Sequence, residues 1–442
     1  MQPYISQKAH KISGDVFAPG DKSISHRSLL LSSMAIGKSS IQGLLESEDV
    51  LHLVEALRML GVHIHKNTSQ QTYEVQGVGL YGFREPSFPL DMGNSGTACR
   101  LLMGALSTLD IKSFFTGDAS LSSRPMKRIL QPLSEMGVRF VAREEGKLPL
   151  VIVGTSDALP ISYELPVPSA QVKSAILLAA LRAYGRSDVI ETFGIRDHTE
   201  NMLSYMGVEV TRKTLPNGRY QISLQGPAEL SACDLSVAGD PSSAAFLTAA
   251  ALLVPGSSLI IRNICFNPTR IGFYQIVEKM GANIEILNET TICNERVVDI
   301  HVSHSPLKAV NVTEDIAPTM IDEFPILAVL ASQAEGASHM AGLAELRVKE
   351  SNRFQAIIDG LRKCGVEVEE NKDAFTIFGQ PKDIRCQETI TTHGDHRIAM
   401  SFLVMGLCAP QGVCVDDISS IQTSFPNFMA LMKQVGADIK VK

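Results

Sequence analysis

The chain has 442 residues, 45% hydrophobic and 20% charged, and this composition excludes a disordered, collagen-like or disulfide-scaffold protein. At the usual ~150 residues per domain, the length predicts about three domains with separate cores. The net charge of −7 argues against a protein that binds nucleic acid over its whole surface, although a local basic cleft is compatible with it. The eight cysteines include no CxxC pair and no zinc-binding spacing, so we expect reduced thiols.

The N-terminal segment and the apolar stretches carry no targeting or membrane signal. Residues 1–17 lack the apolar core that a signal peptide requires. The longest apolar stretches, at 244–255 and 175–181, fall short of the ~18 residues that span a membrane. We therefore expect a soluble cytoplasmic protein that has no membrane partner.

Taken in chain order, six segments share one pattern. Each begins with polar, Gly-rich or Ser-rich residues, continues as an apolar helix of small residues, and ends with Gly and a β-rich tail. The segments begin at Asp21, Asn94, Pro168, Asp240, Asp322 and Asp395, with spacings of 73, 74, 72, 82 and 73 residues. This near-constant spacing indicates an internal repeat, and each unit is too long for an ordinary solenoid.

A second pattern alternates with the first. An amphipathic helix ends in a hydrophobic residue and Gly, and an alternating strand follows. Glycine at this position ends a helix in the left-handed conformation without a Cβ penalty. The glycines are Gly61, Gly137, Gly207, Gly281, Gly365 and Gly436. Each unit is therefore predicted to run helix, strand, helix, strand, with further short strands between, which gives an α/β fold.

The last unit is incomplete, and this predicts how the chain is divided. Residues 395–442 are too few for a full unit of the observed 73-residue spacing, and a further 20 residues precede Asp21. We expect the N-terminal segment to supply the missing strand of the sixth unit. The six units then form two domains of three units each. One comprises residues 1–20 and 240–442 and carries both termini, and the other is the inserted segment 21–239.

The polar residues that open the first helix of each unit predict a site for anions. In five of the six units they are hydroxyl, amide or acidic residues suited to helix capping. Free N–H groups and the helix dipole at such N-termini attract negative charge. If two domains face each other with these N-termini, the cleft between them attracts a small, multiply anionic substrate despite the net charge of −7.

Cationic side chains near the helix openings favour the same kind of ligand. Arginine forms bidentate bonds with phosphate and carboxylate, and lysine supplies a point charge that can also lose a proton. The cations are Lys22, Arg27, Arg124, Arg128, Lys173, Arg196, Arg270, Lys349, Arg353 and Arg397. Two carboxylates, Asp322 and Glu350, stand among them. Alone they are read as a helix cap and an ion-pair partner, but in an anion-binding cleft both are suited to proton transfer.

Other chemical motifs are missing from the sequence. PGDKS lacks the spacing of a phosphate-binding loop, and neither a nucleophile elbow nor a dinucleotide fingerprint occurs. The pairs His63/His65 and His393/His396 come with no third ligand, so we predict no metal site. The absence of tryptophan and the aromatic content of 6% argue against a stacking surface for single-stranded nucleic acid.

Seven strings together resemble the EPSP synthase (3-phosphoshikimate 1-carboxyvinyltransferase) family: PGDKSISHR, GNSGTACR, SSRPMKR, PSAQVKSAILLA, DEFPILAV, LRVKESNR and GDHRIAMSF. The resemblance runs in order from Pro19 to about Phe428. It implies two domains, each of three βαβαββ units. It also implies transfer of the enolpyruvyl group of phosphoenolpyruvate (PEP) to the 5-hydroxyl of shikimate 3-phosphate, with release of phosphate, in the biosynthesis of chorismate and the aromatic amino acids. No metal or organic cofactor is implied, and we expect a monomer that binds these small molecules and no nucleic acid.

The resemblance also assigns residues to the two substrates by motif. Shikimate 3-phosphate would be bound by Lys22, Ser23, Arg27, Ser169, Gln171, Asp322 and Lys349. PEP would be bound by Lys22, Gly96, Arg124, Gln171, Arg353 and Arg397. Further candidates in the same regions are Asn94, Thr97, Ala170 and Arg196. Asp322 would take the proton of the 5-hydroxyl, and Glu350, with Lys22, would protonate the methylene carbon. Glu350 would later remove a proton when the tetrahedral intermediate collapses.

Three positions depart from the better-known bacterial pattern of this family. Ala170 replaces a phosphate-binding Ser, Glu345 stands where Asn is common, and Thr423 replaces a PEP-binding Lys. These departures resemble the class II branch, which is associated with glyphosate tolerance. Gly96 is the unsubstituted residue at a position where Ala can confer tolerance.

Two other functions stay open. A sister enolpyruvyl transferase that acts on UDP-N-acetylglucosamine shares the fold, but would carry a reactive loop cysteine in the second unit. The stretch SLSSRPMKRIL has Arg124 there and no Cys. A non-catalytic repeat protein that binds anions or RNA ends is the other alternative. It would gain nothing from placing Asp322 and Glu350 among its cations.

Overall fold

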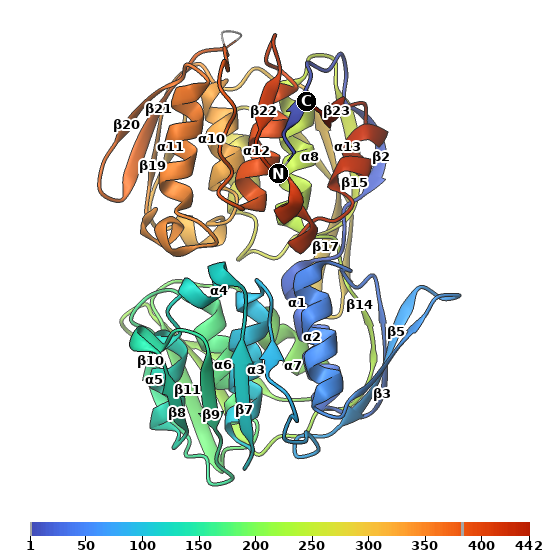
Figure 1. Ribbon diagram of the computed structural model, residues 1–442, viewed down its shortest axis with the longest axis vertical. Coiled ribbons are helices and arrows are strands. Elements are labelled where there is room, and N and C mark those ends of the chain that lie inside the picture. The colour runs from blue at the N-terminus through green and yellow to red at the C-terminus, as the bar shows by residue number, and fades with distance from the viewer. Residues whose placement is uncertain (1, 382–383) are drawn as a thin grey trace. The chain divides into compact units, whose positions relative to one another are not determined.

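The computed structural model describes residues 2–381 and 384–442, which form two compact units (Figure 1). Unit 1 comprises the N-terminal segment up to Pro19, Gly239–Thr290 and Arg296–Lys442. Unit 2 comprises Gly20–Ala238 and the short segment Thr291–Glu295. The chain thus leaves unit 1 after Pro19, returns to it at Gly239, and contributes residues 291–295 to unit 2 once more.

Unit 2 contains one four-stranded sheet for each of its three repeats, in the orders β14-β3-β5-β4, β6-β7-β9-β8 and β10-β11-β13-β12. The strands are β3 (Ile36–Gln42), β4 (His63–Asn67), β5 (Thr72–Val78), β6 (Leu90–Asp91), β7 (Lys112–Thr116), β8 (Arg139–Ala142), β9 (Leu150–Val153), β10 (Ser162–Glu164), β11 (Gly185–Glu191), β12 (Val210–Thr214), β13 (Tyr220–Gly226) and β14 (Asp234–Ser236). The helices are α1 (Lys22–Met34), α2 (Glu48–Met59), α3 (Gly96–Ser107), α4 (Ala119–Ser123), α5 (Lys127–Glu135), α6 (Ala170–Ala180) and α7 (His198–Tyr205).

Unit 1 follows a similar plan, with two four-stranded sheets in the orders β16-β17-β15-β2 and β18-β19-β21-β20 and one three-stranded sheet in the order β22-β1-β23. The strands are β1 (Tyr4–Ser6), β2 (Ser13–Phe17), β15 (Ser258–Cys265), β16 (Asn283–Ile292), β17 (Glu295–Ser303), β18 (Asn311–Val312), β19 (Gly336–Ala341), β20 (Glu367–Glu370), β21 (Ala374–Gly379), β22 (Val413–Val415) and β23 (Ile439–Val441). The helices are α8 (Pro241–Leu253), α9 (Gly272–Lys279), α10 (Phe324–Ser332), α11 (Arg353–Lys363), α12 (His396–Gly406) and α13 (Phe428–Gln434).

A complete repeat runs strand, helix, strand, helix, strand, strand. In the repeat that holds β6, for example, β6 and β7 are parallel, while β9 is antiparallel to both β7 and β8. The parallel pair is joined by a helix, as such crossovers require. The fold is therefore an α/β fold of six repeats of the βαβαββ type. In the sixth repeat, an isolated bridge between Ile390 and Val415 stands in place of the first strand.

The ends of the chain complete repeats that are distant in sequence. Strand β1 lies between β22 and β23 and is antiparallel to both, with Ile5 opposite Cys414 and Lys440. This confirms that the N-terminal segment completes the sixth unit. The rest of that segment behaves differently from the prediction, because β2 pairs with β15 in the fourth repeat. Correspondingly, β14 is the first strand of the first repeat and pairs with β3.

The predicted glycines end the second helix of each repeat. All six have positive φ values, from 77° at Gly365 to 108° at Gly436. In this left-handed conformation each glycine directs the chain from the helix into the following strand. The periodic pattern read from the sequence is thus confirmed at each of these helix ends.

The first helices of the repeats form the centre of each unit. Every residue of α8 is buried, which explains why that helix is apolar on all sides. In unit 2, α3 packs closely against α6, and Gly104 makes this possible. Any side chain there would clash, since an added Cβ would lie 2.4 Å from the carbonyl oxygen of Ala175. No helix in the described part of the chain has the length and apolarity needed to cross a membrane.

Candidate active site

In unit 2, the N-termini of α1, α3 and α6 lie together, because side chains from their first turns bond to one another. Gln171 in α6 donates from Nε2 to Thr97 Oγ1 in α3 over 2.9 Å. Ser95, which caps α3, lies with its Oγ 3.0 Å from His26 Nε2 in α1. We call the polar group around these N-termini the unit 2 cluster. Its members are Lys22, Ser23, Arg27, Asn94, Gly96, Thr97, Arg124, Ser169, Ala170 and Gln171.

Lys22 is the first residue of α1 and forms an ion pair with Asp49 on α2. The carbonyl oxygen of Lys22 also accepts a bond from His26 Nδ1 over 2.7 Å. Burial, together with the positive charge of Lys22, lowers the pKa of His26 to about 4. The ring is therefore neutral at pH 7, and its Nε2 accepts from the Ser95 hydroxyl. A neutral His26 adds no positive charge next to Lys22.

Arg27 is buried and is held by three oxygen atoms. It donates from Nε to Thr199 Oγ1 at 2.7 Å and from Nη2 to Ser174 Oγ at 2.8 Å. It also donates from Nη1 to the Ser23 carbonyl at 3.0 Å. Burial lowers the pKa of Arg27 to about 10, and the nearby charge of Arg196 acts in the same direction. Arg27 remains a cation at pH 7 in a fixed orientation.

Two further guanidinium groups lie over Gly96, the first residue of α3. Arg124 donates from Nη2 to Asn94 Oδ1 at 2.9 Å, and Arg100 donates from Nη1 to Gln171 Oε1 at 2.6 Å. A Cβ at position 96 would lie 2.8 Å from Arg100 Nη1 and 3.2 Å from Arg124 Nη1. Glycine therefore leaves the space that both guanidinium groups use.

Lys173 has a structural role, although sequence analysis grouped it with the ligand-binding cations. Its Nζ lies 2.9 Å from Glu191 and 2.6 Å from Glu200, and the side chain is buried. Burial alone would lower the pKa of Lys173, but the two carboxylates outweigh it and raise the pKa. The charge of Lys173 is thus neutralised inside the unit.

In unit 1, Arg353 is the centre of a second polar group. This first residue of α11 is fully buried, and its Nε donates to Asp395 Oδ2 at 2.8 Å. Its Nη1 lies 3.2 Å from Asp322 Oδ1, and its Nη2 lies 2.5 Å from Glu350 Oε2. Burial would lower the pKa of Arg353, but the charges of the three carboxylates together raise it. Lys349 adds a second cation, with Nζ 3.2 Å from Asp322 Oδ1.

Arg397 extends this group along α12. It donates from Nη1 to the carbonyl oxygen of Asp322 at 3.1 Å, and the same atom lies 3.7 Å from Glu323 Oε1. Glu323 is buried and accepts a short bond from Ser242 at the start of α8. The N-termini of α8, α11 and α12 and the residue before α10 therefore meet at one place. We call Asp322, Lys349, Glu350, Arg353, Asp395 and Arg397 the unit 1 cluster.

The role of Asp322 at its helix differs from the prediction. Sequence analysis read Asp322, taken alone, as a helix cap, but the residue before α10 is Glu323, whose side chain forms no cap bond. The carboxylate of Asp322 instead accepts from Lys349 and Arg353. Asp322 and Glu350 have side chains that are 12% and 23% exposed, so neither carboxylate is fully buried.

The structure places the predicted site residues in two groups, one in each unit, and adds residues that sequence reasoning missed. Arg196 precedes α7, and its positive charge contributes to lowering the pKa of Arg27. Arg100, Asp49 and Asp395 were not proposed, although each holds a predicted residue in place. Arg100 follows Gly96 by four residues in α3, so helical spacing could have identified it.

The chain matches one family over nearly its whole length. Residues 6–432 match the model of EPSP synthase (3-phosphoshikimate 1-carboxyvinyltransferase). The 3-phosphoshikimate 1-carboxyvinyltransferase of Paramagnetospirillum magneticum is 49% identical over 438 residues, which cover 99% of this chain and 98% of that protein. The protein of the same name from Zymomonas mobilis is 49% identical over 443 residues, with 99% and 97% covered.

Solved structures agree with these relatives. The structure of EPSP synthase from Acinetobacter baumannii superposes with a TM-score of 0.88 at 40% identity and covers 100% of both chains. The enolpyruvyl transferase NikO from Streptomyces tendae has a TM-score of 0.76 at 16% identity, with 100% of this chain and 99% of that chain covered. At that level of identity, the second comparison shows a shared fold.

Proposed function

The chain belongs to the EPSP synthase family, and we propose that its two clusters bind the two anionic substrates of that family's reaction. The enzyme transfers the enolpyruvyl group of PEP to the 5-hydroxyl of shikimate 3-phosphate and releases phosphate. The product, 5-enolpyruvylshikimate 3-phosphate, belongs to the route to chorismate and the aromatic amino acids. The observation that carries this proposal is Arg353, a buried cation that holds the two partly exposed carboxylates Asp322 and Glu350.

Shikimate 3-phosphate carries a phosphate and a carboxylate, so it needs fixed donors. Arg27 is suited to this, because Thr199, Ser174 and Ser23 already orient its guanidinium group. The proposed ligands of shikimate 3-phosphate are Lys22, Ser23, Arg27, Ser169, Gln171, Asp322 and Lys349. Asn94, Thr97, Ala170 and Arg196 are further candidates for binding one or the other substrate. Ser169 caps α6, where free N–H groups favour a phosphate.

PEP also carries a phosphate and a carboxylate, and arginine binds both in bidentate fashion. Arg124, Arg353 and Arg397 are each held by an oxygen acceptor of the protein. The proposed ligands of PEP are Lys22, Gly96, Arg124, Gln171, Arg353 and Arg397. At Gly96 the absence of a side chain allows a ligand to approach the start of α3.

The chemistry needs a base and an acid. Asp322 accepts the proton of the 5-hydroxyl while the hydroxyl oxygen adds to C2 of PEP. Glu350 in its protonated form, with Lys22, gives a proton to the methylene carbon C3 and is left as a carboxylate. When the tetrahedral intermediate collapses, the bond from C2 to the phosphate oxygen breaks. Glu350 then takes a proton from C3, which restores the double bond. Lys349 and Arg353 hold Asp322 as a carboxylate, which is the form that a base requires.

A monomer that acts in the cytoplasm fits the same proposal. None of the eight cysteines forms a disulfide bond in the described part of the chain, which is compatible with a reducing compartment. Ala170, Glu345 and Thr423 further support a place in the class II branch, for which we propose weak inhibition by glyphosate. We expect glyphosate to inhibit the purified enzyme weakly and in competition with PEP. Tight inhibition would contradict this assignment.

One assay tests the reaction itself. Phosphate release from PEP is measured with shikimate 3-phosphate and, separately, with UDP-N-acetylglucosamine. We expect release with shikimate 3-phosphate alone. Release with the nucleotide sugar would favour the sister transferase, and no release with either would favour a non-catalytic anion-binding protein.

A further inference from the structure

The tip of the β16–β17 hairpin belongs to unit 2, although both strands pair within unit 1. The hairpin turns at Cys293 and Asn294, whose φ values are 48° and 62°. Two consecutive positive φ values are typical of a tight turn between antiparallel strands. Residues 291–295 group with unit 2 and deliver the carboxylate of Glu295, which is only 2% exposed. A buried carboxylate needs compensating partners in its surroundings.

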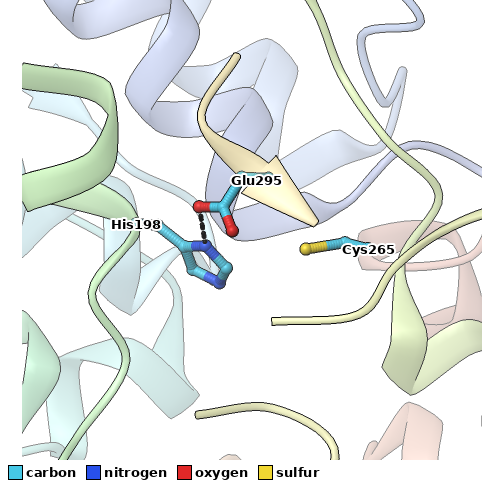
Figure 2. Close-up of side chains that lie close together, drawn as sticks. All are labelled: His198, Cys265 and Glu295. Carbon is cyan, nitrogen blue, oxygen red and sulfur yellow. Dashed lines mark hydrogen bonds and ion pairs between the residues drawn. The ribbon is translucent and has the colours of Figure 1, made fainter. Parts of the chain in front are cut away.

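Glu295 finds these partners on α7. His198, the first residue of α7, donates from Nδ1 to Glu295 Oε1 over 2.8 Å (Figure 2). Asn201, one turn further on, donates from Nδ2 to the same oxygen over 3.1 Å. In return, Asn294 Nδ2 donates to the carbonyl oxygen of Asn201 over 3.3 Å. The hairpin tip is therefore bonded to the first turn of a helix that lies about a hundred residues earlier in the chain.

The two residues that follow His198, Thr199 and Glu200, contact cations. Thr199 Oγ1 accepts from Arg27 Nε at 2.7 Å and lies 2.6 Å from Ser174 Oγ, which accepts from Arg27 Nη2. Glu200 pairs with the buried Lys173. The Asp197 side chain makes no capping hydrogen bond at the start of α7, so contacts with other segments contribute to holding the first turn in place. The contacts from Glu295 are of this kind.

We propose that Glu295 is a positioning residue for shikimate 3-phosphate, because through His198 and Asn201 it fixes the first turn of α7 and hence the orientation of Arg27. Glu295 itself touches neither substrate in this scheme. The inference rests on the proposed role of Arg27 as a ligand of shikimate 3-phosphate. It adds a determinant of substrate affinity that is supplied by a hairpin and lies outside the sequence motifs.

The test compares KM values for the two substrates in purified variants. Glu295→Ala should raise the KM for shikimate 3-phosphate ~10-fold while kcat and the KM for PEP change less than ~2-fold, since misplacing a positioned cation weakens one substrate selectively. Glu295→Gln, which keeps an acceptor oxygen, should give a smaller rise. Glu289→Gln is the matched control, because Glu289 is an exposed carboxylate on the same hairpin, paired with Arg296 at 2.7 Å. It should leave both KM values unchanged.

Two further measurements separate positioning from a loss of folding. His198→Ala should raise the same KM, and the double variant with Glu295→Ala should show little additional effect, because both changes break one connection. A purely structural role would lower the melting temperature and the active fraction of Glu295→Gln without moving either KM, and this would overturn the inference.

Arg27→Ala distinguishes the inference from the proposed function. If Arg27→Ala raises the KM for shikimate 3-phosphate but Glu295→Ala does not, the inference is wrong and the proposed function stands. If Arg27→Ala also leaves that KM unchanged, the assignment of Arg27 as a ligand is wrong and the inference is overturned with it.

Discussion

Arg353 and Asp395 form a fully buried ion pair in which Arg353 Nε donates to Asp395 Oδ2 over 2.8 Å. The second oxygen of Asp395 caps α12 by accepting from the backbone N–H of Arg397 at 2.9 Å. The carboxylate of Asp395 therefore fixes Arg353, which is a proposed PEP-binding cation. It also fixes the start of α12, the helix that carries a second such cation, Arg397. This double use explains why Asp395, a residue with no proposed contact to substrate, is central to the unit 1 cluster.

Asp395→Asn should destabilise the protein at pH 7. Removing one partner of a buried ion pair costs about 3–5 kcal/mol when the other charge is left uncompensated. Because Asp322 and Glu350 still contact Arg353, we expect a loss towards the lower end of that range. Burial would raise the pKa of Asp395, but Arg353 outweighs it and lowers the pKa below its ordinary value. The stabilisation is thus present above the ordinary carboxyl pKa of 3.8 and is lost as the pH falls through the lowered pKa of the folded state.

Urea denaturation at several pH values measures this difference in unfolding free energy. The stabilities of Asp395→Asn and the unmodified protein should differ most near pH 7 and converge in acid. Asp15→Asn, which disrupts an exposed ion pair with Arg262, serves as the control and should have a much smaller effect. Equal losses for the two variants would contradict the buried-pair interpretation.

Asp322→Asn and Glu350→Gln should each reduce kcat by ~10²-fold or more, because each removes a proposed proton-transfer group. Phosphate release from PEP in the presence of shikimate 3-phosphate measures the effect. Asp359→Asn is a matched control, since Asp359 is an exposed carboxylate on α11 that bonds Gln355 at 2.9 Å. Turnover close to that of the unmodified enzyme in both variants would remove these residues from the catalytic assignment.

Gly96→Ala should weaken PEP binding more than shikimate 3-phosphate binding. The new Cβ would lie 2.8 Å from Arg100 Nη1 and 3.2 Å from Arg124 Nη1, so both guanidinium groups must move. We expect the KM for PEP to rise roughly 10-fold, since a small displacement of a binding group costs this much or more. Steady-state kinetics with each substrate varied separately measures the change. A KM for PEP that stays constant would show that Arg100 and Arg124 adjust without cost.

His26→Gln should flatten the dependence of stability on pH in mild acid. Burial, with the charge of Lys22, lowers the pKa of His26 to about 4 in the folded state, against 6.5 for the unfolded chain. The unfolded chain therefore binds the proton first as the pH falls, and the contribution of His26 to stability is present above pH 6.5 and is lost as the pH approaches 4. The difference in pKa corresponds to about 3 kcal/mol.

Melting temperatures or urea midpoints between pH 4 and 7 measure the slope for His26→Gln and for His65→Gln. His65 is exposed on β4 and provides the control, with a slope expected to match that of the unmodified protein. A slope for His26→Gln that is as steep as in the unmodified protein would show that other groups cause the loss of stability in acid.

The repeat and its helix ends were predictable from the sequence because they depend on neighbouring residues. Each Gly such as Gly61 or Gly436 follows a hydrophobic residue at the end of an amphipathic helix, and its left-handed φ is a local property of the chain. The repeat spacing thus predicts six units, although the chain length alone predicts three domains. The family motifs around Lys22 and Arg353 are contiguous strings, so they too were visible.

The tertiary structure decided which distant segments complete one another. Strand β14 joins β3 and strand β2 joins β15, because an open sheet edge pairs with whichever strand the fold brings to it, whatever its sequence distance. Glu295 is buried against His198 for the same kind of reason. Local patterns therefore determined the units and the candidate catalytic residues. Long-range packing alone decided the partners that hold those residues in place, since contacts between residues far apart in the chain leave no periodic signal in the sequence.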